Sequence, residues 1–207
     1  ATSLTTAGIA AMASDDLAKL NTAAVAALTT AQISALNASA IQALNLSQIG
    51  TLSTSQIRSL GTEQISALSA SSLASLTSAQ IQAIKPQDIA YLTTAQVSAL
   101  TADQISNATA VVVSSLSPDQ FEAFSSQQIS ALTVPQINAL TASQVARLDS
   151  TELQSLNDEQ LAALSEKQIA GLSTAHISTL LALSALPFSE SQVAGISTAA
   201  VAALTAS

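Results

Sequence analysis

The sequence repeats every eight residues from its first row to its last, without an insertion or a deletion. Positions 9, 17, 25 and onward in steps of eight to 201 hold Ile, Val, Leu or Phe at 24 of 25 places, with Ala185 as the exception. A Leu commonly follows three residues later, as at Leu28 and Leu36. A short fixed period predicts small units stacked in an array, rather than one core folded around a site.

The composition excludes several classes of function. The chain has a net charge of −8, and its Lys and Arg residues are isolated from one another (Lys19, Arg58, Lys85, Arg147 and Lys167). No basic stripe is available to neutralise phosphates, so we expect no nucleic-acid partner. The chain has no Cys, which leaves neither disulfides nor thiolate metal sites. We expect no signal peptide and no membrane span, since the most apolar stretch, 180–188, is short and is interrupted by Ser184 and Pro187.

Each octad has the pattern of a helix start. The tract Thr29–Leu36 is a clean copy, in which a Thr is followed three residues later by Gln32 and then by Ile33. Thr, Ser, Asn or Asp at the first place can cap a helix, and Gln three residues later completes a capping box. Pro86 and Pro118 fall at the first helical position, where the missing N–H costs nothing. The octads therefore predict one short helix each, beginning at every Thr or Ser.

These short helices predict an all-α fold. In one continuous helix the apolar positions would drift by about 80° per octad, so that no stripe would form. A β-solenoid is disfavoured because Gly is scarce and period-two alternation is absent. We therefore expect an α-solenoid over residues 1–207 as a single array, with two octads per coil and three as the alternative. The indication for two is that Ala108 leaves a gap in a Leu position, while Phe124, two octads later, is oversized.

Two stretches depart from the pattern, and we expect irregular structure at 105–124 and 181–188. In the first, Val112 takes the place of the usual Gln. In the second, Leu181 takes the place of the cap and Ser184 that of Gln. The helix that follows Ser173 is therefore predicted to continue to about residue 185, where Pro187 ends it.

The sequence offers no constellation of catalytic, cofactor-binding or metal-ligating residues. The single histidine, His176, occupies the Gln position of a regular octad and is interpreted as a capping residue. The carboxylates are scattered through first turns, where the helix dipole favours them. Tyr91 replaces the usual small residue and is expected at the surface. Asn37, Asn45 and Asn107 match the glycosylation sequon, as a Ser- and Thr-rich chain does by chance.

The ends of the chain carry ordinary octads. Solenoids normally finish with atypical repeats that cover the stacking surface, yet Leu4 and the tract 201–205 follow the common pattern. We therefore expect either a slice of a longer protein or ends that meet other copies. Head-to-tail contacts that do not close produce a filament.

The tracts Leu28–Leu36 and Leu92–Leu100 resemble the Leu-Thr-x-x-Gln-Ile/Val-x-Ala repeats of very long bacterial secreted or cell-surface proteins, often labelled adhesin-like or haem-utilisation-like. The resemblance covers essentially the whole chain. It implies export and a structural, adhesive or matrix role, whereas one His and one Met give the haem label no support.

The pattern and the resemblance together predict a non-enzymatic structural repeat protein. We expect an extracellular or cell-surface rod, stalk or filament subunit that associates with other copies of itself, end to end or side by side. The alternative is a binding module that presents rows of Thr and Ser to a repetitive ligand such as a polysaccharide or ice. The capping role of those hydroxyls speaks against the alternative.

Overall fold

All regular structure is helical in the computed structural model, which describes residues 5–182 and 188–196. Within these residues there are 23 helices of four to eight residues, and none is long and apolar enough to cross a membrane. The predicted all-α fold of very short helices is confirmed. The chain divides into two compact units, Ala1–Ala108 and Thr109–Ser207. The single continuous array over 1–207 stays a prediction.

The described part of unit 1 contains thirteen helices, which follow one another at intervals of one octad: α1 (Thr6–Ala10), α2 (Ser14–Ala18), α3 (Thr22–Ala26), α4 (Thr30–Ser34), α5 (Ala38–Ala43), α6 (Leu46–Gly50), α7 (Thr54–Ser59), α8 (Thr62–Ala67), α9 (Ala70–Ser75), α10 (Ser78–Ala83), α11 (Pro86–Ile89), α12 (Thr94–Ser98) and α13 (Ala102–Asn107).

The described part of unit 2 contains ten helices: α14 (Ala110–Ser114), α15 (Pro118–Glu122), α16 (Ser126–Ser130), α17 (Val134–Ala139), α18 (Ala142–Val145), α19 (Ser150–Ser155), α20 (Asp158–Ala162), α21 (Glu166–Ala170), α22 (Thr174–Leu181) and α23 (Glu190–Ala194).

The capping chemistry explains where the helices begin. Thr29 has extended backbone, its side chain accepts the N–H of Gln32 at 3.2 Å, and the Gln32 side chain accepts the N–H of Thr29 at 2.8 Å. The same capping box begins α12 and α18. Pro86 and Pro118 are the first residues of α11 and α15, as predicted. Local hydrogen bonds therefore fix most of these helix starts in the register of the octad, whereas α2 and α11 begin without a side-chain cap.

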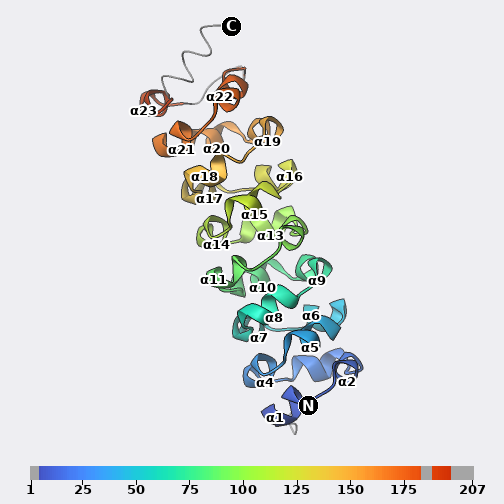
Figure 1. The fold of residues 1–207 in the computed structure, drawn as a ribbon. Coiled ribbons are helices and arrows are strands. Elements are labelled where there is room, and N and C mark those ends of the chain that lie inside the picture. The colour runs from blue at the N-terminus through green and yellow to red at the C-terminus, as the bar shows by residue number, and fades with distance from the viewer. Residues whose placement is uncertain (1–4, 183–187, 197–207) are drawn as a thin grey trace. The chain divides into compact units, whose positions relative to one another are not determined.

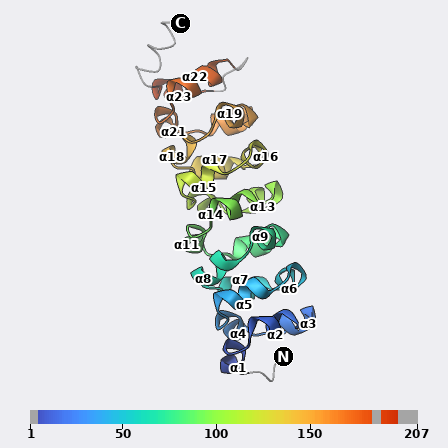
Figure 2. The same cartoon turned by 45° about the vertical axis from the view of Figure 1, so that its right-hand side comes forward.

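The coil contains three octads, and the expectation of two is wrong. Within each unit a helix packs against the helix three places later, for example α1 on α4, α4 on α7 and α16 on α19. Helices α1, α4 and α7 lie one above another in Figure 1 and again in Figure 2. Stacked positions are therefore separated by three octads. The expected pairing of Ala108 with Phe124 required helices two octads apart to be stacked on each other. The stacked helices are instead three octads apart.

The core of each unit is formed by the two apolar positions of every octad. Ile33, Leu73 and Ile129 are fully buried, and the Leu that precedes the next cap is nearly so, as at Leu60. Each fully buried side chain of this kind contributes about 1.5–3 kcal/mol to stability relative to an exposed one. Each octad directs both of these apolar side chains to the same side. The three octads of a coil therefore enclose a continuous apolar interior.

Of the two stretches expected to be irregular, the structure describes 105–124 completely and 181–188 only in part. The octad register continues on both sides of residue 108, with Thr101, Thr109 and Ser117 as successive caps. Helix α22 is the longest of the described helices and extends to Leu181, past the usual end of an octad. The remainder of its predicted course, 183–187, lies outside the described residues.

Candidate functional site: a ladder of buried glutamine amides

The most distinctive polar groups of this protein are buried glutamine side chains, all at residue numbers that are multiples of eight. These positions, called ladder positions below, are the third residue of each helix. Fourteen of them hold a Gln that is at most 6% exposed: Gln32, Gln48, Gln56, Gln64, Gln80, Gln96, Gln104, Gln120, Gln128, Gln136, Gln144, Gln160, Gln168 and Gln192. A buried amide is costly unless both of its ends are hydrogen-bonded.

The oxygen end of the amide serves the helix to which the glutamine belongs. Gln96 Oε1 accepts the backbone N–H of Thr93 at 2.6 Å, and Gln144 Oε1 accepts that of Thr141 at 2.8 Å. Gly61 has no side chain with which to cap α8, yet its N–H still donates to Gln64 Oε1 at 2.8 Å. The glutamine half of the capping box therefore persists where the hydroxyl half is missing.

The nitrogen end of the amide bonds to the coil below. Gln96 Nε2 donates to the carbonyl of Leu68 at 2.6 Å, and Gln144 Nε2 to that of Leu116 at 3.0 Å, in both cases 28 residues earlier. The accepting Leu directly precedes the cap of the helix one coil below. The glutamines that make this bond include, in unit 1, Gln48, Gln56, Gln64, Gln80, Gln96 and Gln104, and in unit 2 Gln144, Gln160, Gln168 and Gln192.

These bonds form what we call the glutamine ladder. Each amide joins the start of its own helix to the corner one coil below, so one side chain satisfies two backbone groups that helix ends leave without partners. Such a bond contributes about 0.5–1.5 kcal/mol, and leaving its buried partners unpaired costs more. The ladder therefore fixes the distance and rotation between successive coils, which the apolar contacts alone leave less specific.

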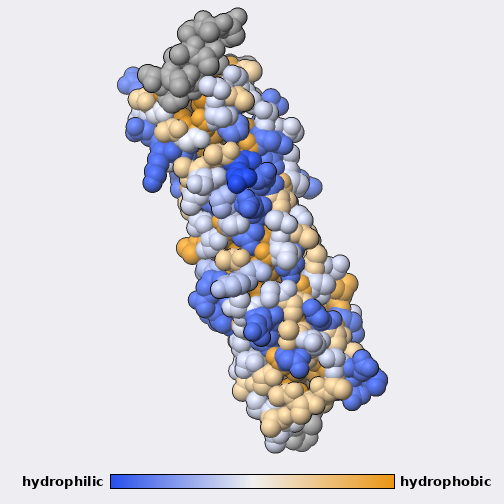
Figure 3. Space-filling model, in the orientation of Figure 1, coloured by the Kyte–Doolittle hydropathy of each residue, from blue (hydrophilic) through white to orange (hydrophobic). Residues whose placement is uncertain are grey.

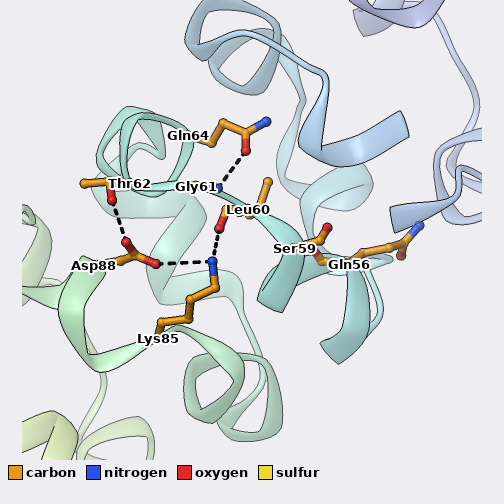
Figure 4. Close-up of polar contacts among 8 residues, drawn as sticks. All are labelled: Gln56, Ser59, Leu60, Gly61, Thr62, Gln64, Lys85 and Asp88. Carbon is orange, nitrogen blue, oxygen red and sulfur yellow. Dashed lines mark hydrogen bonds and ion pairs between the residues drawn. The ribbon is translucent and has the colours of Figure 1, made fainter. Parts of the chain in front are cut away.

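A lysine and an aspartate replace the ladder bond in α11 (Figure 4). Lys85 takes the cap place and Asp88 the ladder position. Lys85 Nζ donates at 2.9 Å to the carbonyl of Leu60, the residue that directly precedes the cap of α8 one coil below. The buried Asp88 accepts the hydroxyl of Thr62 on Oδ1 at 2.6 Å, while its Oδ2 lies 3.9 Å from Lys85 Nζ and has no hydrogen-bond partner. The contact with the lower coil is thus kept by a different residue.

The predicted role of His176 as a capping residue is confirmed. Its Nδ1 accepts the N–H of Ser173 at 3.2 Å, and its own N–H donates to Ser173 Oγ at 3.3 Å. Burial lowers the pKa of His176 from its ordinary value of 6.5, and a hydrogen bond with the backbone of Leu148 raises it in part. Leu148 directly precedes the cap of α19 one coil below, so the backbone that acts on the imidazole is at the position that the ladder amides reach. Because Nδ1 accepts, the ring N–H is on Nε2.

Glu152 is the acidic counterpart of the glutamines in α19. It is 7% exposed, its Oε2 accepts the N–H of Asp149 at 2.8 Å, and its own N–H donates to Asp149 Oδ1 at 2.7 Å. Burial raises the pKa of the Glu152 carboxyl above its ordinary value of 4.5, and the charges of Asp149 and Glu122 raise it further. The hydrogen bond from Asp149 opposes these effects.

The other residues singled out in the sequence do not converge on one site. Tyr91 is exposed, as expected. Asn37 and Asn45 cap α5 and α6 through their side-chain oxygens, whereas the amide of Asn107 donates to the Asp103 carbonyl at 2.8 Å. No group of three or more metal-ligating side chains occurs within the described residues. On the face drawn in Figure 3, hydrophilic and hydrophobic residues are interspersed.

The nitrogen end of the glutamine is the functional contact that the sequence analysis missed. A capping box needs only an acceptor at this position, and Glu would also interact favourably with the helix dipole. The chain nevertheless uses Gln at most ladder positions. Since an ionised Glu has no donor, the preference for Gln was the available signal that the side chain also donates a hydrogen bond.

The comparisons with known proteins agree with a repeat tract. The family model described as ALTTAQ repeat matches residues 9–46 and 46–78, two tandem copies within unit 1. A search of the curated proteins finds no match to the chain. The repeat predicted from the sequence is thus supported, while the adhesin-like context stays a prediction.

Proposed function

We propose that this protein is a structural repeat segment, a rod, stalk or filament subunit that acts outside the cell or on its surface. The observation that carries the proposal is the glutamine ladder. The buried amides bond one coil to the next, so the polar groups of the interior serve stacking rather than the binding of a ligand. A segment built this way adds one coil with every three octads and can have any length.

The same observation supports a non-enzymatic role. Catalytic sites collect titratable groups with shifted pKa values in a pocket. Here the pKa shifts found among the described residues fall on Glu152 and His176, and both of these residues occupy ladder positions where they replace a capping Gln. Their unusual environments are thus explained by stacking.

The structure also supports assembly more than the alternative function, in which rows of Thr and Ser hydroxyls on one face bind a repetitive ligand. Thr77, Ser125 and Ser165 would contribute to such a face, yet each accepts a helix N–H and also donates to the oxygen of its own ladder Gln. These hydroxyls are therefore occupied at both ends. The proposed extracellular location is based on the resemblance of the octads alone. The proposed association with further copies is based on the stacking chemistry of the coils.

Electron microscopy of the purified chain and of a variant that duplicates residues 29–100 tests the proposal. The duplication adds three coils, so we expect narrow particles that lengthen by about 27–30 Å, given a spacing of about 9–10 Å between packed helices. Ordered fibres at higher protein concentration would support the filament role. Compact particles that grow in width, or monomers that retain an immobilised glycan without assembling, would contradict it.

A further inference from the structure

Glu152 satisfies half of the ladder contact. Its Oε2 accepts the Asp149 N–H at 2.8 Å, as the amide oxygen of a ladder Gln does, and the side chain is buried in the stack. Its other oxygen, Oε1, is the atom that corresponds to the amide nitrogen of a ladder Gln. An ionised carboxylate has no proton to donate, whereas a neutral carboxyl group carries one O–H and matches the shape of the glutamine amide.

The partner that a donor at position 152 would reach is the carbonyl of Phe124, which directly precedes the cap of α16 one coil below. In the complete ladder bonds the equivalent carbonyl accepts an amide N–H, as Leu116 does from Gln144 at 3.0 Å. No hydrogen bond found among the described residues reaches the carbonyl of Phe124. The lower coil therefore offers an acceptor at the place where Glu152 lacks a donor.

We propose that Glu152 is a pH-sensitive member of the ladder, which joins α19 to the coil below when its carboxyl group is protonated and loosens that junction when it ionises. The proton resides on Oε1 and is donated to the Phe124 carbonyl, while Oε2 keeps the Asp149 N–H. On ionisation the proton passes to solvent, and the carboxylate faces a carbonyl oxygen. The contribution of Glu152 to the stability of unit 2 is then larger in mildly acidic surroundings than at neutral pH. This inference goes beyond the structural role proposed above.

The charged groups around Glu152 act in the same direction, with one exception. Asp149 on the same helix start and Glu122 one coil below are both acidic, and their charges disfavour a second carboxylate. Arg147 weakens the effect of Glu122, to which it donates at 2.7 Å. Of the helices packed on α19, α16 contains no charged residue. The other, α22, contains His176, whose charged form is disfavoured by burial.

The sign of the effect follows from linkage. Below the ordinary value of 4.5 the carboxyl is protonated in both the folded and the unfolded chain, and the ladder bond is complete. As the pH rises above 4.5, the unfolded chain loses its proton first, because burial raises the pKa in the fold. The contribution of Glu152 to the free energy of unfolding is therefore lost as the pH rises through its pKa in the folded chain. Above that pKa this contribution changes no further.

Thermal unfolding of the wild type, Glu152→Gln and Glu159→Gln from pH 4.5 to 8 tests the proposal. Glu159 is an exposed acid in the first turn of the next helix, so its substitution makes the same chemical change without touching the ladder. Glu152→Gln supplies a permanent donor. We expect its Tm to exceed that of the wild type by about 2–4 °C at pH 8, the shift expected of one restored hydrogen bond in a chain of this size, and the excess to vanish toward pH 4.5.

Two outcomes would overturn the proposal: an excess in Tm that does not change with pH, or the same pH-dependent excess in Glu159→Gln. His176 titrates in all three proteins, so the differences between them cancel its contribution. If Glu152→Gln does not fold, the carbon-13 resonance of the Glu152 carboxyl in the wild type decides the matter. A midpoint above the ordinary value of 4.5 supports the proposal, and a midpoint at or below that value contradicts it.

Discussion

Gln48 Nε2 lies 2.7 Å from the carbonyl oxygen of Leu20, a residue 28 places earlier in the chain. The separation equals one coil of three octads plus the four residues between that Leu and the ladder position of its helix. Because this relationship recurs in both units, the octad has two functions at once. It begins a helix through its cap, and it joins that helix to the one stacked beneath it.

Removing one ladder amide should destabilise the protein strongly. In Gln168→Ala the carbonyl of Leu140 and the N–H of Ser165 lose their partner, and the carbonyl of Ile137 keeps only the N–H of Leu140. Each unpaired buried group costs about 1–3 kcal/mol, so we expect the free energy of unfolding to fall by about 2–4 kcal/mol. Chemical denaturation measures the change.

The matched control is Gln127→Ala, which truncates an exposed glutamine next to a ladder position in α16. We expect a change within about 0.5 kcal/mol, as is usual for surface substitutions. Equal decreases in the free energy of unfolding for Gln168→Ala and Gln127→Ala would show that a buried ladder amide stabilises the stack no more than an exposed glutamine does.

The caps can be tested with two adjacent threonines. Thr29 accepts the N–H of Gln32 at 3.2 Å, whereas Thr30 is the first helical residue and is exposed. Thr29→Ala should lower the free energy of unfolding by about 1 kcal/mol, the usual cost of losing a cap. Thr30→Ala should leave it nearly unchanged. Equal unfolding midpoints for the two variants would count against the capping role of Thr29.

The helix starts could be predicted from the octad because capping is local. A Thr, a Gln three residues later and an Ile or Val after that specify one helix start wherever they occur, and Gln32 and Gln96 follow this rule. The number of octads per coil could not be predicted in the same way. It depends on how far the chain turns at the extended residues between helices, such as Leu60 and Gly61, and nothing in the octad pattern encodes that angle.

The Lys85 and Asp88 substitutions should be energetically coupled. Asp88→Gln alone leaves Lys85 Nζ on the Leu60 carbonyl that the new amide needs, and Lys85→Thr alone leaves the buried Asp88 carboxylate without a nearby cation. The double variant restores an ordinary cap and ladder amide. We expect it to be more stable than the sum of the single effects by about 0.5–3 kcal/mol.

A double-mutant cycle measured by urea denaturation gives this coupling. Additive effects would mean that Lys85 and Asp88 do not replace the ladder bond jointly. The sequence analysis did not link the two residues, because each was explained by its own position in the octad. Only the three-octad coil places the lysine over the carbonyl that the missing glutamine would reach.

The contribution of His176 to stability should decrease in acid, opposite in sign to that of Glu152. Its pKa is lowered in the fold, chiefly by burial, so the unfolded chain binds a proton first as the pH falls below 6.5. The contribution of His176 to the free energy of unfolding is fully present above pH 6.5. It is lost as the pH falls through that value toward the pKa of His176 in the folded chain. In His176→Gln this loss should disappear. The Tm difference between variant and wild type, measured from pH 5 to 8, should therefore increase toward acid, and parallel profiles would contradict the prediction.

The most direct test of the glutamine ladder is a nuclear magnetic resonance measurement of coupling across the hydrogen bond itself. In isotopically labelled protein, the side-chain nitrogen of Gln144 should couple to the carbonyl carbon of Leu116, to which Nε2 donates at 3.0 Å. A coil of two octads would instead place the carbonyl of Phe124, one octad nearer in the chain, opposite this nitrogen. Coupling to Leu116 is the predicted result; coupling to Phe124, or no coupling from a resolved Gln144 side chain, would contradict the three-octad ladder.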